Sequence, residues 1–261
     1  MNINEVLDRL EKLYDEEKWE LAERELARGK KLFPGSLELR EWESILLASE
    51  ERFEEALKVL DSILAQEPGR LTAMRERATL LLELGRFEEA LSSLRSLEAR
   101  NAGADDPVEK ASIHFEMASC LDRLGTAAAA DAEFRKAEQH SGEYPAPSRL
   151  GPEEFDALVA QALDSIPDKF QPYLRQVSVV TRDYPTGEDP DPFLLGLYVG
   201  VPRTERSIDE KDNPDTIFIY KRNHELLNLP REELREEIRK TVVHEIAHHF
   251  GLGEEDMGEY A

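Results

Sequence analysis

The sequence has very little cysteine, no long apolar run and few basic residues relative to acidic ones. Cys120 is the single cysteine among 261 residues, so the chain cannot form an internal disulfide or a CxxC metal site. The longest nearly apolar run, Phe193–Pro202, is too short to span a bilayer. Residues 1–17 contain neither a basic region nor a strongly apolar one, so we expect no signal peptide and a cytoplasmic location.

The shortage of basic residues limits the partners of the protein. The chain has 33 Lys and Arg against 56 Asp and Glu, which gives a formal net charge of −23. Nucleic acids are bound mainly by Lys and Arg side chains that neutralise phosphates, and here these side chains are outnumbered. Anionic membrane surfaces attract basic segments in the same way. We therefore expect neither nucleic-acid binding nor membrane binding.

The first half of the chain contains a repeat with a period of 34 residues. Three segments each place an aromatic residue three positions before an alanine, at Trp19/Ala22, Phe53/Ala56 and Phe87/Ala90. The three alanines are 34 residues apart, and Pro34 and Pro68 close the first two units at the same spacing. A looser unit follows the third one after a turn-rich segment, with Ala130 at the alanine position.

This pattern resembles the tetratricopeptide repeat, whose unit is a hairpin of two helices. In that family, small residues let the two helices approach closely. Ser44, Ala78 and Ala118 occupy the small position of the first helix in units two to four, whereas Leu10 stands there in unit one. The resemblance implies an all-α superhelix of about four hairpins over residues 1–145. It also implies that a peptide or protein partner binds its concave face.

A segment rich in proline and glycine, at about residues 140–152, interrupts the helical pattern and indicates a linker between two domains. Beyond it, residues 146–261 are expected to form a small α+β domain. Two helices are predicted in this domain, at Phe155–Ile166 and Pro230–Phe250. Three strands are predicted between the helices, at Val177–Thr181, Phe193–Val199 and Thr216–Tyr220.

The long final helix contains two histidines at a spacing suited to metal binding. His244 and His248 are four residues apart, so they project from one face of the helix and can hold one tetrahedral zinc ion. This face lies nearly opposite Val242 in the apolar stripe of the helix, so the pair is expected to face a cleft or solvent. Glu245 follows the first histidine and is suited to accept a proton from zinc-bound water.

A carboxylate beyond this helix can complete the set of ligands. Gly251 permits a sharp turn, and Glu254, Glu255 and Asp256 follow it. Two histidines and one carboxylate form an established catalytic zinc set, in which a fourth position stays open. Glu254 is the first candidate for the third ligand, and Glu255 and Asp256 are the alternates.

The sequence HEIAHHFGLGE resembles the metzincin pattern HExxHxxGxx followed by His or Asp. From about residue 152, the chain is similar to minimal zincin-like metallopeptidases of bacteria, also in LLGLYVGVPRTERS and TIFIY. The resemblance implies that His244, His248 and Glu254 are zinc ligands and that Glu245 is the general base. Two features depart from the pattern. Glu254 stands where His or Asp is usual, and Met257 lies too close to the ligands to form a Met-turn.

Together these features predict a zinc-dependent peptidase whose repeat domain recruits protein substrates or partners. The alternative is an interaction scaffold with a weakly active or inactive zincin-like domain. Glu245 favours the enzyme, because a purely structural zinc site does not need it. Gly200–Ser207 is the candidate sheet edge to which an extended substrate would add. His249 is expected to support the site or lie at the surface, and no role is assigned to His114, His140 and His224.

Overall fold

The structure is a computed structural model that describes residues 2–101, 103, 105–167, 171–174, 177–186, 189, 191–201 and 215–251. The chain divides into two compact units, Met1–Tyr144 and Pro145–Ala261. No helix in the described ranges is both long and apolar enough to cross a membrane.

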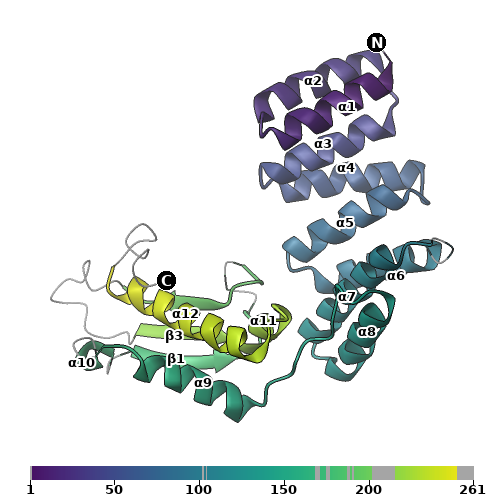
Figure 1. The fold of residues 1–261 in the computed structure, drawn as a ribbon. Coiled ribbons are helices and arrows are strands. Elements are labelled where there is room, and N and C mark those ends of the chain that lie inside the picture. The colour runs from purple at the N-terminus through teal and green to yellow at the C-terminus, as the bar shows by residue number, and fades with distance from the viewer. Residues whose placement is uncertain are drawn as a thin grey trace. The chain divides into compact units, whose positions relative to one another are not determined.

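The first unit is built from helices that pair in sequence order into hairpins, and the hairpins stack on one another (Figure 1). The described helices of this unit are α1 (Ile3–Asp15), α2 (Trp19–Leu32), α3 (Leu37–Ser49), α4 (Phe53–Gln66), α5 (Leu71–Glu83), α6 (Phe87–Asn101), α7 (Pro107–Arg123) and α8 (Ala127–His140). The small residues expected at the helix contacts are buried, namely Ser44, Ala78 and Ala118 in the first helices and Ala22, Ala56, Ala90 and Ala130 in the second. The predicted repeat architecture is therefore confirmed.

Each hairpin turns at a residue in the left-handed backbone conformation. Glu17, Glu51 and Gly85 have φ angles of 54°, 59° and 67°, and Gly125, with φ 75°, stands at the same place in the fourth hairpin. In each turn, the N–H of this residue donates to a carbonyl three residues earlier. Glycine adopts this conformation freely, whereas a residue with a Cβ is strained in it.

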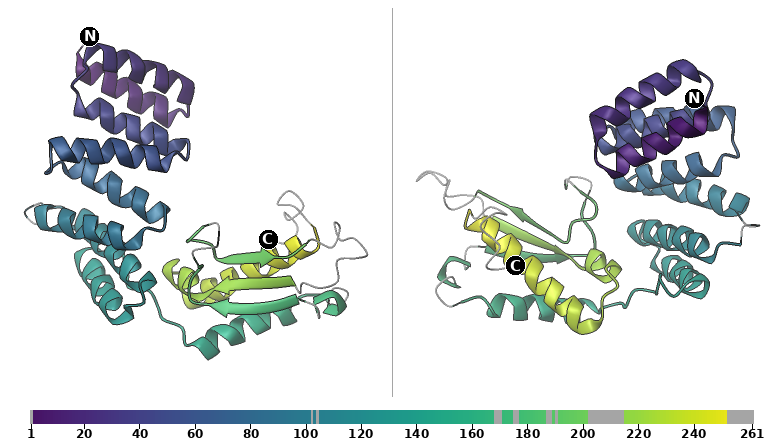
Figure 2. Two further views of the ribbon diagram at one scale, coloured as in Figure 1. Left: turned by 180° about the vertical axis from the view of Figure 1, so that it is seen from behind. Right: turned by 45° about the horizontal axis from the view of Figure 1, so that its top comes forward.

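The second unit is a small sheet covered by helices. The described elements are α9 (Pro152–Asp164), α10 (Gln171–Leu174), β1 (Val177–Arg182), β2 (Gly196–Val199), β3 (Asp215–Tyr220), α11 (Lys221–Leu226) and α12 (Arg231–His249). Figure 2 shows the three strands side by side, with β3 in the middle. β3 pairs with β1 in parallel and with β2 antiparallel, so β2 is an edge of the described sheet.

One face of the sheet forms a common core with α9 and α12. Ile217 and Ile219 of β3 are fully buried at the centre of this core. The helices contribute buried apolar residues at helical spacing, namely Phe155, Val159 and Ala162 from α9 and Leu234, Ile238, Val242 and Ile246 from α12. A helical region followed by a small α+β region is the fold class that the sequence predicts.

Two details of the second unit differ from the sequence prediction. β2 begins at Gly196, not at Phe193, because the side-chain amide of Asn223 donates to the carbonyls of Pro192 and Leu194 and holds this segment in a turn. Helices α10 and α11 were not predicted, because four and six residues are too few to show a helical period.

Candidate metal and proton-transfer site

The orientation of α12 is set by its apolar stripe. Leu234, Ile238, Val242 and Ile246 face the core, and this fixes the direction in which the remaining side chains of the helix point. His244 and His248 are half-buried, as expected for a face that is turned away from the main core. Glu245 lies between these two faces and is buried.

The two histidines point toward each other. Their Nε2 atoms are 3.0 Å apart, and the rings are nearly perpendicular, at an interplanar angle of 82°. Two N–H groups cannot meet at this distance without repulsion, so at least one Nε2 presents its lone pair to the other. Two nitrogen ligands of a tetrahedral zinc ion, each about 2.0–2.1 Å from the metal, lie about 3.3 Å apart. The pair therefore fits the donor arrangement that zinc requires.

Glu245 is buried against the edge strand β2, with an exposed fraction of 7%. A Cβ atom on Gly196 would lie 2.7 Å from Glu245 Cγ and 2.8 Å from its Oε1, so this strand approaches the carboxyl group through a glycine. Burial raises the pKa of Glu245 to about 7, while a hydrogen bond from the backbone N–H of Tyr198 lowers it. A carboxyl group with such a pKa exchanges protons readily near neutral pH.

The carboxyl group of Glu245 lies on the open side of β2. The N–H of Tyr220 donates to the carbonyl of Leu195 over 2.9 Å, and Gly196 stands opposite Ile219. Backbone groups in an antiparallel pair alternate between the two sides of a strand. The N–H groups of Gly196 and Tyr198 therefore point away from β3, and the one from Tyr198 reaches Glu245.

A buried polar layer continues from Glu245 toward α11. His224 is fully buried, with Nδ1 at 2.8 Å from the carbonyl of Tyr220 and Nε2 at 3.1 Å from the hydroxyl of Thr241. The carbonyl can only accept, so Nδ1 carries the proton, and the single hydroxyl proton of Thr241 is shared between Nε2 and the carbonyl of Glu237, which lies 3.0 Å from the hydroxyl oxygen. Burial lowers the pKa of His224 to about 4, so this residue is neutral at physiological pH. The sequence assigned no role to His224. The structure places it against Thr241 of α12, the helix that also carries His244 and His248.

His249 is also buried, and it belongs to a second polar pair. Its Nδ1 is 2.7 Å from Oδ2 of Asp215, and the two residues are 1% and 2% exposed. It therefore does not lie at the surface, which was one of the two expectations for it. Sequence reasoning missed Asp215 and Tyr198, whose neighbourhood only the fold reveals. For Gly196 the sequence did offer a signal, because a glycine inside a predicted strand often marks a place where another part of the chain approaches the backbone closely.

The candidates for the third ligand lie outside the described residues. Glu254, Glu255 and Asp256 all lie beyond Gly251, the last described position. Within the described part of the chain, no three His, Cys, Asp or Glu side chains converge on a point that could hold a metal ion. Of the candidate sheet edge at Gly200–Ser207, only Gly200 and Val201 are described.

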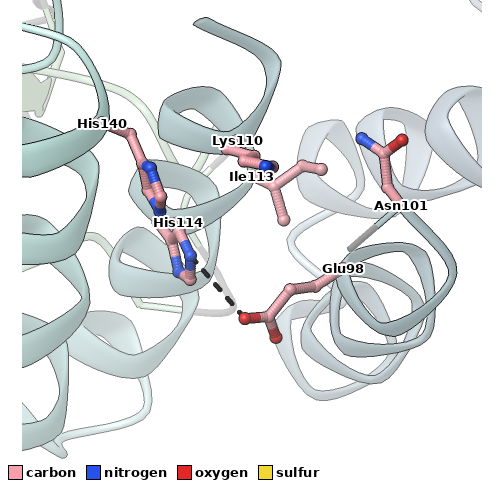
Figure 3. A pocket seen from close by; sticks show the side chains of 6 residues that line it. All are labelled: Glu98, Asn101, Lys110, Ile113, His114 and His140. Atoms are coloured by element: carbon pink, nitrogen blue, oxygen red, sulfur yellow. Dashed lines mark ion pairs between the residues drawn. The ribbon is translucent and has the colours of Figure 1, made fainter. Parts of the chain in front are cut away.

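A separate pocket of about 220 Å³ lies in the repeat unit (Figure 3). Its buried His114 has Nδ1 at 2.7 Å from Glu133 and Nε2 at 3.7 Å from Glu98, and its ring stacks on that of His140. The side chain of Lys110 also lines the pocket, beside Asn101 and Ile113. These residues form no motif with known chemistry, and we assign the pocket no function.

Two family models match separate parts of the chain. Residues 174–261 match the zincin-like metallopeptidase family, and residues 47–111 match the tetratricopeptide repeat. The chain therefore contains tetratricopeptide repeats and a zincin-like metallopeptidase domain, as the sequence predicts. A comparison with curated proteins gave no match.

Solved structures that are similar to the chain include two repeat proteins. One is MamA (residues 41 to the end) from Desulfovibrio magneticus RS-1, with 17% identity, 61% of this chain and 81% of that chain covered, and a TM-score of 0.47. The other is a thermophilic TPR protein of Thermus thermophilus, with 20% identity, 67% and 96% coverage, and a TM-score of 0.45.

Proposed function

We propose that the protein is a zinc-dependent peptidase. The observation that carries this proposal is the convergence of two imidazole nitrogens beside a buried carboxyl group at the edge of a sheet. His244 and His248 would hold the zinc ion, together with a carboxylate from Glu254, Glu255 or Asp256. Zinc in such a site supplies a Lewis acid that polarises a carbonyl and lowers the pKa of bound water.

Glu245 acts as the general base in this proposal. Glu245 follows His244 in the sequence, but its side chain projects from a different face of α12. It can therefore move a proton beside the metal without binding the metal itself. The backbone of β2 packs against its side chain and limits the positions that the carboxyl group can take. Glu245 would accept a proton at a carboxylate oxygen and then deliver it to the leaving amine.

The open side of β2 is the proposed place for the substrate. An extended peptide can add to a sheet edge through main-chain hydrogen bonds, which bind any sequence in a fixed direction. The N–H groups of Gly196 and Tyr198 point to this side, and Glu245 already accepts from one of them. A peptide bound here would therefore pass beside the carboxyl group that the reaction needs.

The repeat unit is the proposed recruiting element. Its architecture leaves a helical surface on which other proteins bind repeats of this kind. The formal charge of −23 favours basic partner segments over acidic ones. The proposed division of labour is that the repeats bring a protein to the second unit, which cleaves it.

Substitutions at the site test the proposal directly. The wild-type protein should bind about one zinc ion per chain, measured by elemental mass spectrometry, and His244→Ala should abolish this binding. Glu245→Gln should keep the zinc but lower hydrolysis of a peptide library at least about a hundredfold, because the amide is not a base. The proposal fails if His244→Ala binds zinc as the wild type does, or if Glu245→Gln cleaves at the wild-type rate.

The same measurements identify the third ligand. Glu254→Gln should lose most of the zinc, since an amide is a poor ligand for this metal. Full zinc retention in this variant would assign the third ligand to Glu255 or Asp256 instead.

A further inference from the structure

The end of α12 is joined to the start of β3 by a buried polar pair. Asp215 is the first residue of β3 and His249 is the last residue of α12. The distance between His249 Nδ1 and Asp215 Oδ2 is 2.7 Å, and both side chains are almost completely buried. The pair therefore connects two elements that are distant in the sequence, directly beside His248.

This location matters because helix ends fray. The last four carbonyls of a helix have no partner within the helix, and the final turn is the easiest one to unwind. His248 lies in this final turn, whereas His244 lies one turn earlier in the body of the helix. Unwinding of the last turn would separate the two Nε2 atoms that now lie 3.0 Å apart.

The turn that follows α12 depends on the same residues. Gly251 has a φ of 73°, and its N–H donates to the carbonyl of His248 over 3.0 Å. This left-handed glycine ends the helix. A displacement of the last turn would therefore move His248 and the turn at Gly251 together.

The surroundings leave room for the carboxylate of Asp215 and little else. A Cβ on Gly200 would collide with Asp215 Oδ1 and would lie 2.6 Å from the hydroxyl oxygen of Tyr198. The ring of Tyr198 in turn packs edge-on against His249, with 5.9 Å between the ring centroids. The neighbouring strand therefore fixes both members of the pair.

A buried polar pair is not the most stable way to fill this space. Removing a carboxylate and an imidazole from water costs several kcal/mol, and an apolar pair of similar volume would often be at least as stable. What an apolar pair lacks is a short polar contact such as the one of 2.7 Å that joins one atom of α12 to one atom of β3, because apolar contacts permit sliding.

We infer that Asp215 and His249 are positioning residues of the metal site, which hold the last turn of α12 so that His248 meets His244 at one metal ion. This inference rests on the proposed function, because it takes the two histidines to be ligands. It assigns His249 a role other than that of a ligand, since His249 does not converge with His244 and His248 on one point among the described residues.

The test measures zinc affinity by competition with a chelator in the full-length protein. Asp215→Ala should weaken zinc binding about 10- to 100-fold, the range seen when supporting partners of metal sites are removed. Asp215→Asn keeps a polar side chain of the same size next to His249, so its loss should be smaller. Zinc affinity of Asp215→Ala within about twofold of the wild type overturns the inference.

Two control variants separate positioning from a general loss of stability. Val159→Ala removes a buried group from α9 in the same core without touching the end of α12, and it should leave zinc affinity unchanged. His114→Gln breaks a pair of the same chemistry, with Glu133 at 2.7 Å, in the repeat unit and should have no effect on zinc. An equal loss of zinc affinity in Val159→Ala and Asp215→Ala would make the role of the pair merely structural and overturn the inference.

If Asp215→Ala does not fold, Gly200→Ala gives the same answer, because its new methyl group displaces the carboxylate of Asp215. Unchanged zinc affinity in a folded Gly200→Ala protein counts against positioning. Failure of the proposed function has a different signature, since the wild-type protein itself would then bind no zinc, or His244→Ala would bind it normally.

Discussion

Replacing Gly196 with alanine is the sharpest test of how the site is packed. Gly196 lies on β2 where the strand passes the side chains of Glu245 and Thr241 on α12. Its replacement adds a single methyl group and no charge, so any effect comes from the space that this group needs. The backbone at Gly196 is ordinary strand, so no strain from a left-handed conformation is added.

The size of the effect follows from the contact distances. The new Cβ would lie 2.7 Å from Glu245 Cγ and 2.8 Å from Thr241 Cγ2, whereas ordinary contacts begin at 3.4 Å. Strand and helix must therefore separate by roughly half an ångström, or both side chains must rotate. Overpacking of this kind costs about 1–3 kcal/mol of stability. A misplacement of about 1 Å costs on the order of a hundredfold in rate, so we expect a loss of about tenfold in hydrolysis.

The assay compares three proteins by urea unfolding and by peptide hydrolysis. Gly151→Ala is the matched control, because Gly151 belongs to the same unit and a Cβ there has no atom within 4 Å. We expect Gly196→Ala to lose both stability and rate, with its zinc content retained, since it does not touch the histidine pair. If Gly196→Ala has the stability and rate of Gly151→Ala, Glu245 is not held by β2 and our account of the site is wrong.

Two further predictions concern stability. His224 has a pKa lowered by burial to about 4, so folding must exclude its charged form, and stability is lost as the pH falls from 6.5 toward 4. A shift of this size corresponds to about 3 kcal/mol, and urea titrations followed by circular dichroism should show a flatter pH dependence in His224→Gln. Equal pH dependence in both proteins would show that His224 is not the titrating group. In the repeat unit, Glu51→Gly should raise stability by about 1 kcal/mol, because glycine removes the strain of the left-handed conformation at this turn. Gly125→Ala should lower it by a similar amount, although a Cβ there has open space, and tryptophan fluorescence in urea measures both. A loss of stability in Glu51→Gly, or a gain in Gly125→Ala, would contradict the assignment of strain to the turns.

The sequence was sufficient to predict the elements that repeat or that show a clear period. The spacing of Ala22, Ala56 and Ala90 predicted the hairpins, because each alanine marks a contact between two helices. The motif around His244 and His248 predicted a convergent pair, because four residues make about one turn of a helix. In both cases the relevant distances are local, so a pattern along the chain determines the geometry.

The sequence was insufficient where the geometry depends on partners distant in the chain. Asp215 follows the turn-rich sequence SIDEKDNP and resembles an ordinary turn residue, and only the register of β3 places it beside His249. The burial of Glu245 also depends on β2. The sequence of this strand contains no charged side chain that would indicate a functional site. The roles of His244, Glu245 and His248 stay predictions until the substitutions are measured.

The two units also differ in how far apart in the chain their partners lie. Each hairpin of the repeat unit joins neighbouring helices, whereas the core of the second unit joins α9 to α12 across all three strands. Chain closure over long separations slows folding, and so does parallel pairing such as that of β1 with β3. The repeats are therefore the unit that forms early, while the histidine pair on α12 acquires its neighbours only when the slower unit has closed. During synthesis and refolding, the helical surface of the repeats is therefore in place before the surroundings of His244 and His248 are complete.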